Sequence, residues 1–327
     1  MKKVNKSIFI NFLRNNYVLL LLVAVVAIFT ILSKGRFLSE PSIRNILRVS
    51  VPTLLIASIA TLLMVSGNID LSVGAALGIS AVVFAILRQS GMNFFLALII
   101  VLALGCVMGA INGFLVMKLR ITSVIATLAT MSLFYGFGKF MVPDGQDMIK
   151  YDMPENMIFF AKGDFFLKLP PSIFVTIFLI IIIILFEKRT TLGKYTIAIG
   201  DNRLAAELSG INAVRTVTII YVAVGAMAAL AGVTRSSFMT AGDPASGMGI
   251  EVDVIIAILL GGTSFFGGEG SVIKTVAGVF ILVCLTNGLT MAGAEPYWSI
   301  LVRGLVFFLA LVFENFVKKV RTSAVLE

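Results

Sequence analysis

The sequence of 327 residues contains no histidine and only two cysteines. Without histidine, the chain cannot form Ser-His-Asp or Cys-His nucleophilic sites, histidine-ligated zinc centres or histidine-ligated haem. Cys106 and Cys284 each lie inside a separate apolar run, where we expect small buried side chains rather than a structural disulfide. We therefore expect no catalytic residues and no metal site in this chain.

Charged residues are also scarce. They form 13% of the sequence, against 59% hydrophobic residues and a mean hydropathy of +1.04. Soluble domains are about 25% charged and about 45–50% apolar, so a water-soluble fold of this size would expose apolar surface throughout. The composition predicts an all-α, polytopic membrane protein.

A nucleotide-binding loop is missing as well. The Walker A pattern G-x-x-x-x-G-K-[ST] surrounds phosphate groups with backbone amides and a lysine. The nearest approach runs from Gly268 to Lys274 and Thr275, but Ile273 stands at the position of the second glycine. We therefore expect that this chain does not bind ATP through a Walker A motif and binds no other cofactor.

Long apolar runs are abundant, and about 20 largely apolar residues suffice for a membrane-spanning helix. About ten such helices, forming a single transmembrane domain over 1–327, are predicted. We place them at 17–32, 51–66, 71–87, 94–117, 121–142, 172–186, 216–233, 252–266, 272–291 and 298–316. The first run follows several basic residues, as in a signal peptide, but no small-x-small cleavage site follows it, so we expect a retained span.

The positive charges indicate the orientation of these spans. Lys and Arg number 26 against 17 Asp and Glu, and with ten spans most of them fall in segments on the same side as the N-terminus. By the positive-inside rule, both termini are then cytoplasmic, and we do not interpret the excess as a nucleic-acid-binding surface. The acidic segment 143–171 would lie outside and the basic segment 187–215 inside.

A polar segment, 67–74, lies at the break between the second and third apolar runs. Asp70 could accept backbone N–H groups at the start of the following helix. Alternatively, Asp70 and Asn68 could line a polar route at a helix break. Both interpretations are open from the residues alone.

A second interruption, 261–271, is rich in glycine. Gly261, Gly262, Gly267 and Gly268 permit either a break between half-helices or a plain tight turn. Ten spans place both interruptions on the same side of the membrane, so this pairing does not support an inverted repeat.

Small and polar residues inside the spans indicate close helix packing. Gly105, Gly109 and Gly113, and likewise Gly74 and Gly78, have the G-x-x-x-G spacing that lets helix backbones approach closely.

Polar side chains within spans need partners. Asn112 and Asn287 are expected to form hydrogen bonds between helices, although contact with a substrate is the alternative. Lys139 and Arg303 could extend toward the interface or face a cavity, and Arg303 is the better functional candidate because it lies inside its span.

The inner segment 193–212 contains a short amphipathic helix. Asp201 or Asn202 can cap its start and Gly210 can end it, while Leu204, Leu208 and Ile211 would share one face. Such a helix either lies on the membrane surface or inserts into a partner's groove.

Three of these segments, in order, resemble the ribose/xylose/galactose branch of ABC importer permeases. They are 67–74, 193–212, and Glu251-Val252-Asp253 leading into 261–271, and the resemblance extends over about 45–316. Two residues depart from the family pattern: Asn68 stands where a second glycine is usual, and Lys274 where a glycine is common.

The resemblance implies the type II ABC importer transmembrane fold and a permease in the bacterial plasma membrane. Its implied partners are membrane lipid, a cytoplasmic tandem ATPase that hydrolyses the ATP, a second permease subunit (identical or different) and an extracytoplasmic sugar-binding protein contacting outer loops such as 143–171. The implied substrate is a monosaccharide, or a related polyol or furanose such as autoinducer-2.

The resemblance also assigns two sets of residues. The ATPase-coupling loop would include Gly193, Asp201, Asn202, Leu204, Ala205, Leu208 and Gly210. The translocation path or helix breaks would include Asn68, Asp70, Gly261, Gly262, Gly267, Gly268 and Arg303.

Two other classes of function fit the sequence less well. An ion-coupled secondary transporter would need acidic residues near the middle of the membrane, yet Asp70, Glu251, Asp253 and Glu269 lie at span ends. An intramembrane enzyme would need histidine or paired acids deep within spans, and the sequence offers neither.

Overall fold

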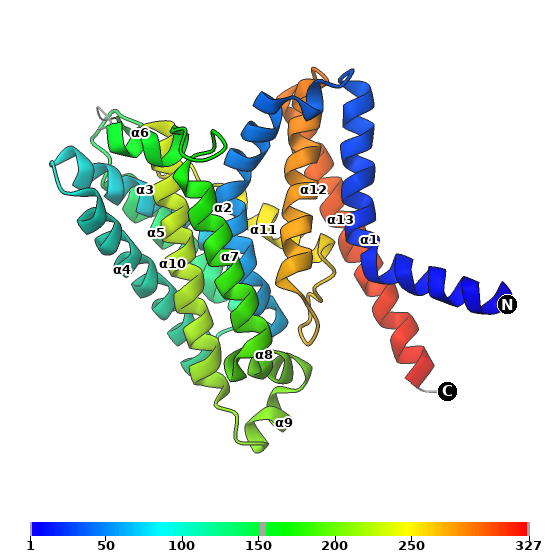
Figure 1. The fold of residues 1–327 in the computed structure, drawn as a ribbon. Coiled ribbons are helices and arrows are strands. Elements are labelled where there is room, and N and C mark those ends of the chain that lie inside the picture. The colour runs from blue at the N-terminus through cyan, green and yellow to red at the C-terminus, as the bar shows by residue number, and fades with distance from the viewer. Residues whose placement is uncertain (1, 151–154, 326–327) are drawn as a thin grey trace.

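The computed structural model describes residues 2–150 and 155–325, and helices account for 76% of the chain. Its two short strands, β1 (Ile149–Lys150) and β2 (Ala241–Gly242), form one antiparallel pair. Figure 1 shows long helices running side by side, with α6 (Glu155–Lys162) at one end of the bundle and α9 (Arg203–Leu208) projecting from the other. These are called the α6 end and the α9 end below. The mainly helical fold predicted from composition is confirmed.

The other helices overlap the predicted runs in chain order, except that η1 and α8 lie between runs and that α11 ends at Leu260, before the end of the run predicted at 252–266. They are α1 (Lys2–Leu32), η1 (Arg36–Leu38), α2 (Glu40–Val65), α3 (Val73–Gln89), α4 (Phe94–Gly113), η2 (Phe114–Lys118), α5 (Ser123–Phe140), α7 (Pro171–Arg189), α8 (Thr191–Asp201), α10 (Ala213–Met239), α11 (Ile250–Leu260), α12 (Val272–Met291) and α13 (Pro296–Val325).

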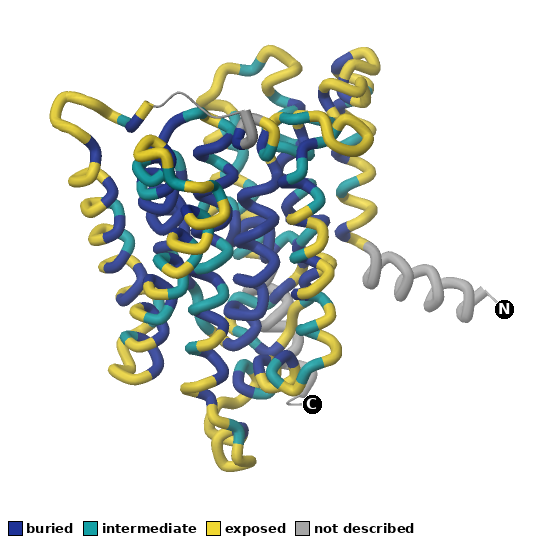
Figure 2. The backbone as a smooth tube through the Cα atoms, turned by 60° about the vertical axis from the view of Figure 1, so that its left-hand side comes forward, coloured by how far each residue is buried: buried dark blue, intermediate teal, exposed yellow. Residues whose placement is uncertain are grey.

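Two helices, α2 and α10, form the centre of the bundle. In their most apolar stretches 83% of α2 and 67% of α10 is buried, whereas only 28% is buried in the more apolar spans of α4 (with η2) and α7. Figure 2 shows this contrast as a dark blue centre with yellow outer helices. A helix that is apolar all round yet exposed is typical of a membrane environment.

The lengths of the helices allow five clear membrane crossings within the described chain. These are α2, α4 together with η2, α7, α10 and α12. Shorter apolar helices occupy 17–32, 73–89 and 296–312. Helix α11 has 11 residues and is therefore about 16 Å long, roughly half the thickness of a bilayer core. The total of ten crossings remains a prediction.

The glycines of α4 form the contact with α10. An added Cβ on Gly105 would overlap the carbonyl oxygen of Gly225, and one on Gly109 would overlap that of Tyr221. Because backbone atoms occupy this space, only glycine allows the two helices to approach this closely. The packing role predicted for this G-x-x-x-G pattern is confirmed.

The glycines of α3 contact a different kind of partner. A Cβ on Gly74 would overlap the carbonyl of Gly247, and one on Gly78 the carbonyl of Pro244. Residues 243–249 are not helical, and they connect β2 to α11. The expectation of helix-on-helix packing is therefore wrong for this pair: the glycines accommodate a non-helical segment that leads into the short helix α11.

Polar residues within the spans mostly pair with neighbouring elements. The Nδ2 of Asn45 on α2 donates to Oδ1 of Asn287 on α12 at 3.2 Å, which confirms the predicted bond between helices. Lys139, near the end of α5, instead forms an exposed ion pair with Asp147 at 3.3 Å.

Candidate functional site

A buried polar network occupies the break between α2 and α3. Asp70 accepts hydrogen bonds through Oδ1 from the backbone N–H and the hydroxyl of Ser72, at 2.8 and 2.7 Å. Its Oδ2 accepts from Nδ2 of Asn112 on α4 at 3.1 Å. The Oδ1 of Asn112 accepts in turn from Thr130 on α5 at 2.7 Å. The network thus connects the break to two other helices.

Asp70 acts differently from the predicted helix cap. Ser72 is the residue before α3 and makes no side-chain cap, while Asp70 bonds the N–H of Ser72 two residues along the chain. Asp70 is 7% exposed, and in the described part of the chain it forms no ion pair. A buried carboxylate is costly unless hydrogen bonds satisfy it, and here three donors do so.

Neighbouring helices also hold the backbone of this break. The N–H of Leu71 donates to Oγ1 of Thr127 on α5 at 3.1 Å. The hydroxyl of Tyr221 on α10 donates to the carbonyl of Ile69 at 3.2 Å. Backbone groups without helical partners must find others in an apolar interior, and these two side chains provide them. The side chain of Asn68, by contrast, donates locally, to the carbonyl and hydroxyl of Ser66.

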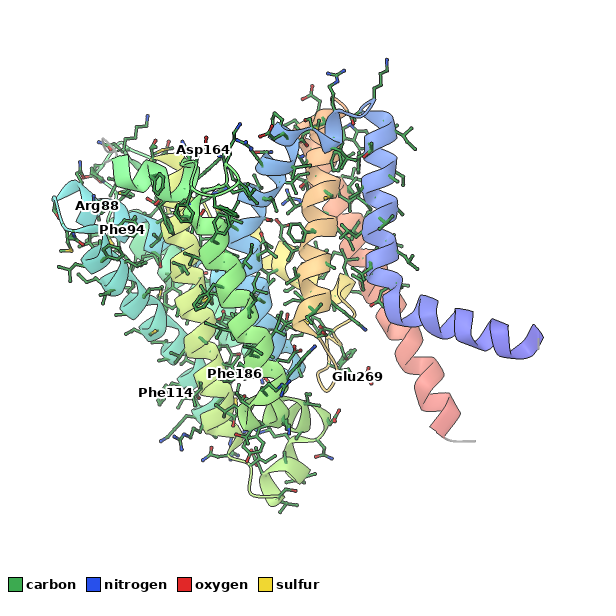
Figure 3. All side chains as sticks on the ribbon, viewed as in Figure 1. Arg88, Phe94, Phe114, Asp164, Phe186 and Glu269 are labelled. Carbon is green, nitrogen blue, oxygen red and sulfur yellow. The ribbon has the colours of Figure 1, made fainter. Side chains whose placement is uncertain are left out.

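The second break is a compact loop between α11 and α12. Gly262, Gly267 and Gly268 have φ of +76°, +92° and +83°, a conformation that favours glycine. The N–H of Ser264 donates to the carbonyl of Glu269 at 2.9 Å, which closes the loop on itself. The glycine-rich pattern therefore forms a tight turn, and Figure 3 places Glu269 toward the α9 end.

The two breaks lie against each other. The N–H of Gly268 donates to the carbonyl of Val65, the last residue of α2, at 2.9 Å. A Cβ on Gly267 would lie 2.9 Å from the N atom of Gly67. The expectation that both breaks lie on the same side is thus confirmed.

The α8–α9 arm, residues 191–208, forms the projecting end of the molecule. Thr190 caps α8 by accepting from the N–H of Gly193 at 3.1 Å, and Asn202 caps α9 by accepting from the N–H of Ala205 at 3.0 Å. Of the two predicted caps, Asn202 has this role, whereas Asp201 is the last residue of α8.

The end of α9 follows the predicted signal. Gly210 has a φ of +85°, its N–H donates to Glu207, and the N–H of Ile211 donates to Ala206. This pair of bonds is the Schellman arrangement that commonly ends a helix at glycine.

The apolar side chains of α9 point away from the bundle. Leu204 is 68% exposed and Leu208 is 82% exposed, whereas Ala206 is buried. Ala205 is exposed beside Leu204. A short helix that presents two leucines to solvent is suited to insertion into a partner's groove.

A residue that the sequence did not single out connects α7 to α12. Glu187, near the end of α7, accepts through Oε1 from the N–H of Val272 at 3.1 Å. It thereby satisfies one of the unpaired N–H groups at the start of α12.

Cys284 and Cys106 are both free.

Arg303 lies apart from these breaks. Its Nη1 donates to both carboxylate oxygens of Asp253 on α11, at 3.1 and 3.0 Å, and its Nε donates to the carbonyl of Ser299. The Arg303 and Asp253 side chains remain 31% and 22% exposed. This half-exposed pair joins the short helix α11 to α13 and leaves polar atoms accessible.

Long apolar helices, polar interruptions between them and an exposed helical arm are features of a polytopic membrane protein. The chain belongs to the family described as "Branched-chain amino acid transport system / permease component", whose model matches residues 42–311. The predicted membership in the importer permeases is confirmed, and such subunits are components of transporters rather than enzymes.

Several curated relatives resemble the chain over most of its length. The ribose import permease protein RbsC of Bacillus subtilis (strain 168) is 36% identical, covering 85% of this chain and 86% of its own. The L-arabinose transport system permease protein AraH of Escherichia coli (strain K12) is 34% identical, covering 80% and 78%. The galactose/methyl galactoside import permease protein MglC of Haemophilus influenzae is 32% identical, covering 91% and 92%. No solved structure matches the chain.

Proposed function

We propose that this chain is the permease subunit of an ATP-binding-cassette importer that moves a monosaccharide across the bacterial plasma membrane. The observation that carries the proposal is the α8–α9 arm, whose exposed Leu204 and Leu208 project from an otherwise membrane-type bundle. The likeness to permeases named for ribose, L-arabinose and galactose supports a neutral, polyhydroxylated substrate. A related polyol or furanose belongs to the same chemical class.

The energy for import would come from partners. A cytoplasmic tandem ATPase would hydrolyse ATP and receive α9 in a groove, so this chain itself would need no cofactor. A second permease subunit, identical or different, would complete the path. An extracytoplasmic sugar-binding protein would deliver the substrate at the α6 end.

The chain itself would form one transmembrane domain of the type II importer fold, with about ten spans and both termini cytoplasmic. The two breaks, with Asn68, Asp70, Gly261, Gly262, Gly267 and Gly268, would border the inner part of the path. The half-exposed Asp253–Arg303 pair would offer carboxylate and guanidinium groups to sugar hydroxyls in the path.

The test is purification of the tagged full chain in mild detergent, identification of co-purifying proteins and an ATPase assay. We expect a tandem ATPase to co-elute and its activity to rise when a sugar-loaded binding protein is added. The binding protein then identifies the sugar. A chain that elutes alone and transports under an ion gradient would contradict the proposal.

A further inference from the structure

One backbone carbonyl, that of Val65 at the end of α2, is the meeting point of three segments. It accepts the N–H of Gly268 at 2.9 Å, which joins α2 to the loop between α11 and α12. Gly200, inside α8, lies directly against the same carbonyl and against the N atom of Gly268, and an added Cβ would overlap both. The arm therefore touches both helix breaks through backbone atoms.

Neighbouring residues extend this contact. The Oδ1 atom of Asp201 lies where a Cβ on Gly268 would stand, and Gly267 faces both Gly67 and Val65. A side chain can relieve a new overlap by changing its rotamer. Backbone atoms have no rotamers, so an overlap with them is relieved only when the segment itself moves. A displacement of α8 must therefore move the end of α2 and the loop 261–271 together, or separate from them.

The two helices of the arm are nearly continuous in the chain. Only Asn202 separates α8 from α9, and its side chain caps α9. A force on the exposed leucines of α9 would therefore be transmitted along α8 to Gly200.

We propose that Gly200 is a positioning residue through which the α8–α9 arm shifts both helix breaks, with the Gly268–Val65 hydrogen bond as the link that changes between states. The inference rests on the proposed function, because the ATPase is the partner that would displace the arm. Gly200 is then the point of contact, and a single methyl group at this position should uncouple ATP hydrolysis from transport.

The test uses Gly200→Ala in the complete complex with ATPase and binding protein, reconstituted in proteoliposomes. We expect the variant to insert and to retain the ATPase, since α9 is unchanged, but sugar taken up per ATP hydrolysed should fall about tenfold or more. A purely structural defect would lower both rates in proportion and leave this ratio unchanged. The matched control is Gly136→Ala in α5, where a Cβ meets nothing within 4 Å. A wild-type ratio for Gly200→Ala would overturn the inference.

A second measurement needs no substitution. Hydrogen exchange of the wild-type complex, with and without trapped nucleotide, reports on the N–H of Gly268. We expect exchange in peptides covering 261–271 to differ between the two states, while peptides covering Gly136 stay the same. Identical exchange in both states would overturn the inference even if Gly200→Ala fails to fold. If the wild-type chain binds no ATPase at all, the proposed function itself fails before any variant is compared.

Discussion

At the scale of single residues, Asp70 shows how a carboxyl group can be accommodated inside an apolar bundle. Its two oxygens accept from Ser72 and Asn112, and Asn112 accepts from Thr130. A satisfied buried network is stabilising, whereas removing one member leaves its partners unpaired. The network therefore ties the break between α2 and α3 to α4 and α5.

Two substitutions at Asp70 should differ in severity. Asp70→Asn keeps one oxygen for Ser72 but turns an NH₂ group toward Nδ2 of Asn112, so it should cost about 1–3 kcal/mol and retain most uptake. Asp70→Leu removes the acceptor of the backbone N–H and hydroxyl of Ser72 and one of the two acceptors of Nδ2 of Asn112, so it should abolish assembly or transport. Thermal unfolding of the purified chain and sugar uptake check both outcomes.

The control for thermal unfolding is Asp147→Asn, at a side chain that is 94% exposed, which should leave the unfolding temperature unchanged. Equal and severe loss of uptake in Asp70→Asn and Asp70→Leu would indicate that the charge itself is required in transport.

At the scale of helices, two kinds of contact decide the arrangement. Glycine faces let α4 approach α10 and let residues 243–249 approach α3. In the capped α8–α9 arm, by contrast, the leucines of α9 remain exposed. The buried faces stabilise the bundle, and the uncovered face is available for a partner.

The α4–α10 contact should be sensitive to a single methyl group. Gly109→Ala would push a Cβ against the carbonyl of Tyr221, and overpacking of this kind costs about 1–3 kcal/mol. We expect a lower melting temperature for the purified chain. Gly304→Ala in α13, where a Cβ meets nothing within 4 Å, is the control, and equal melting temperatures would contradict a tight contact.

The exposed face of α9 should matter only for the assembly. Changing Leu204 and Leu208 together to Asp should abolish uptake and co-purification of the ATPase, because an apolar groove would have to bury two charges. Membrane insertion and melting temperature should stay at wild-type values, since both side chains are mostly exposed. Normal uptake by this variant would refute docking through α9.

At the scale of the whole molecule, the two ends of the bundle differ in construction. The α6 end carries the exposed pair Lys139 and Asp147 and the short β1–β2 pair, and the α9 end carries the two breaks and the arm. This asymmetry suits a permease that receives substrate at one end and contacts an ATPase at the other.

The orientation can be measured by labelling single cysteines. In a chain with Cys106→Ala and Cys284→Ala, Asp147→Cys should react in intact cells with a maleimide that cannot cross membranes. Ser209→Cys, just beyond α9, should react only after permeabilisation. Labelling of both positions from outside would contradict the proposed topology.

Local features of the chain were predictable because they depend on neighbouring residues. The apolar runs predicted helices, Asn202 and Gly210 predicted the ends of α9, and the spacing of Gly105, Gly109 and Gly113 predicted a close helix contact. Hydropathy and capping act within a few residues, so the sequence by itself determined these features.

The tertiary structure alone decided which distant residues meet. Three contacts join residues far apart in the chain: the Asn112–Asp70 hydrogen bond, the capping of α12 by Glu187, and the contact of Gly200 with the carbonyl of Val65. Nothing local distinguishes Gly200 from other helical glycines. Such contacts depend on how the helices pack in three dimensions, because the same side chain or glycine serves whichever element lies against it.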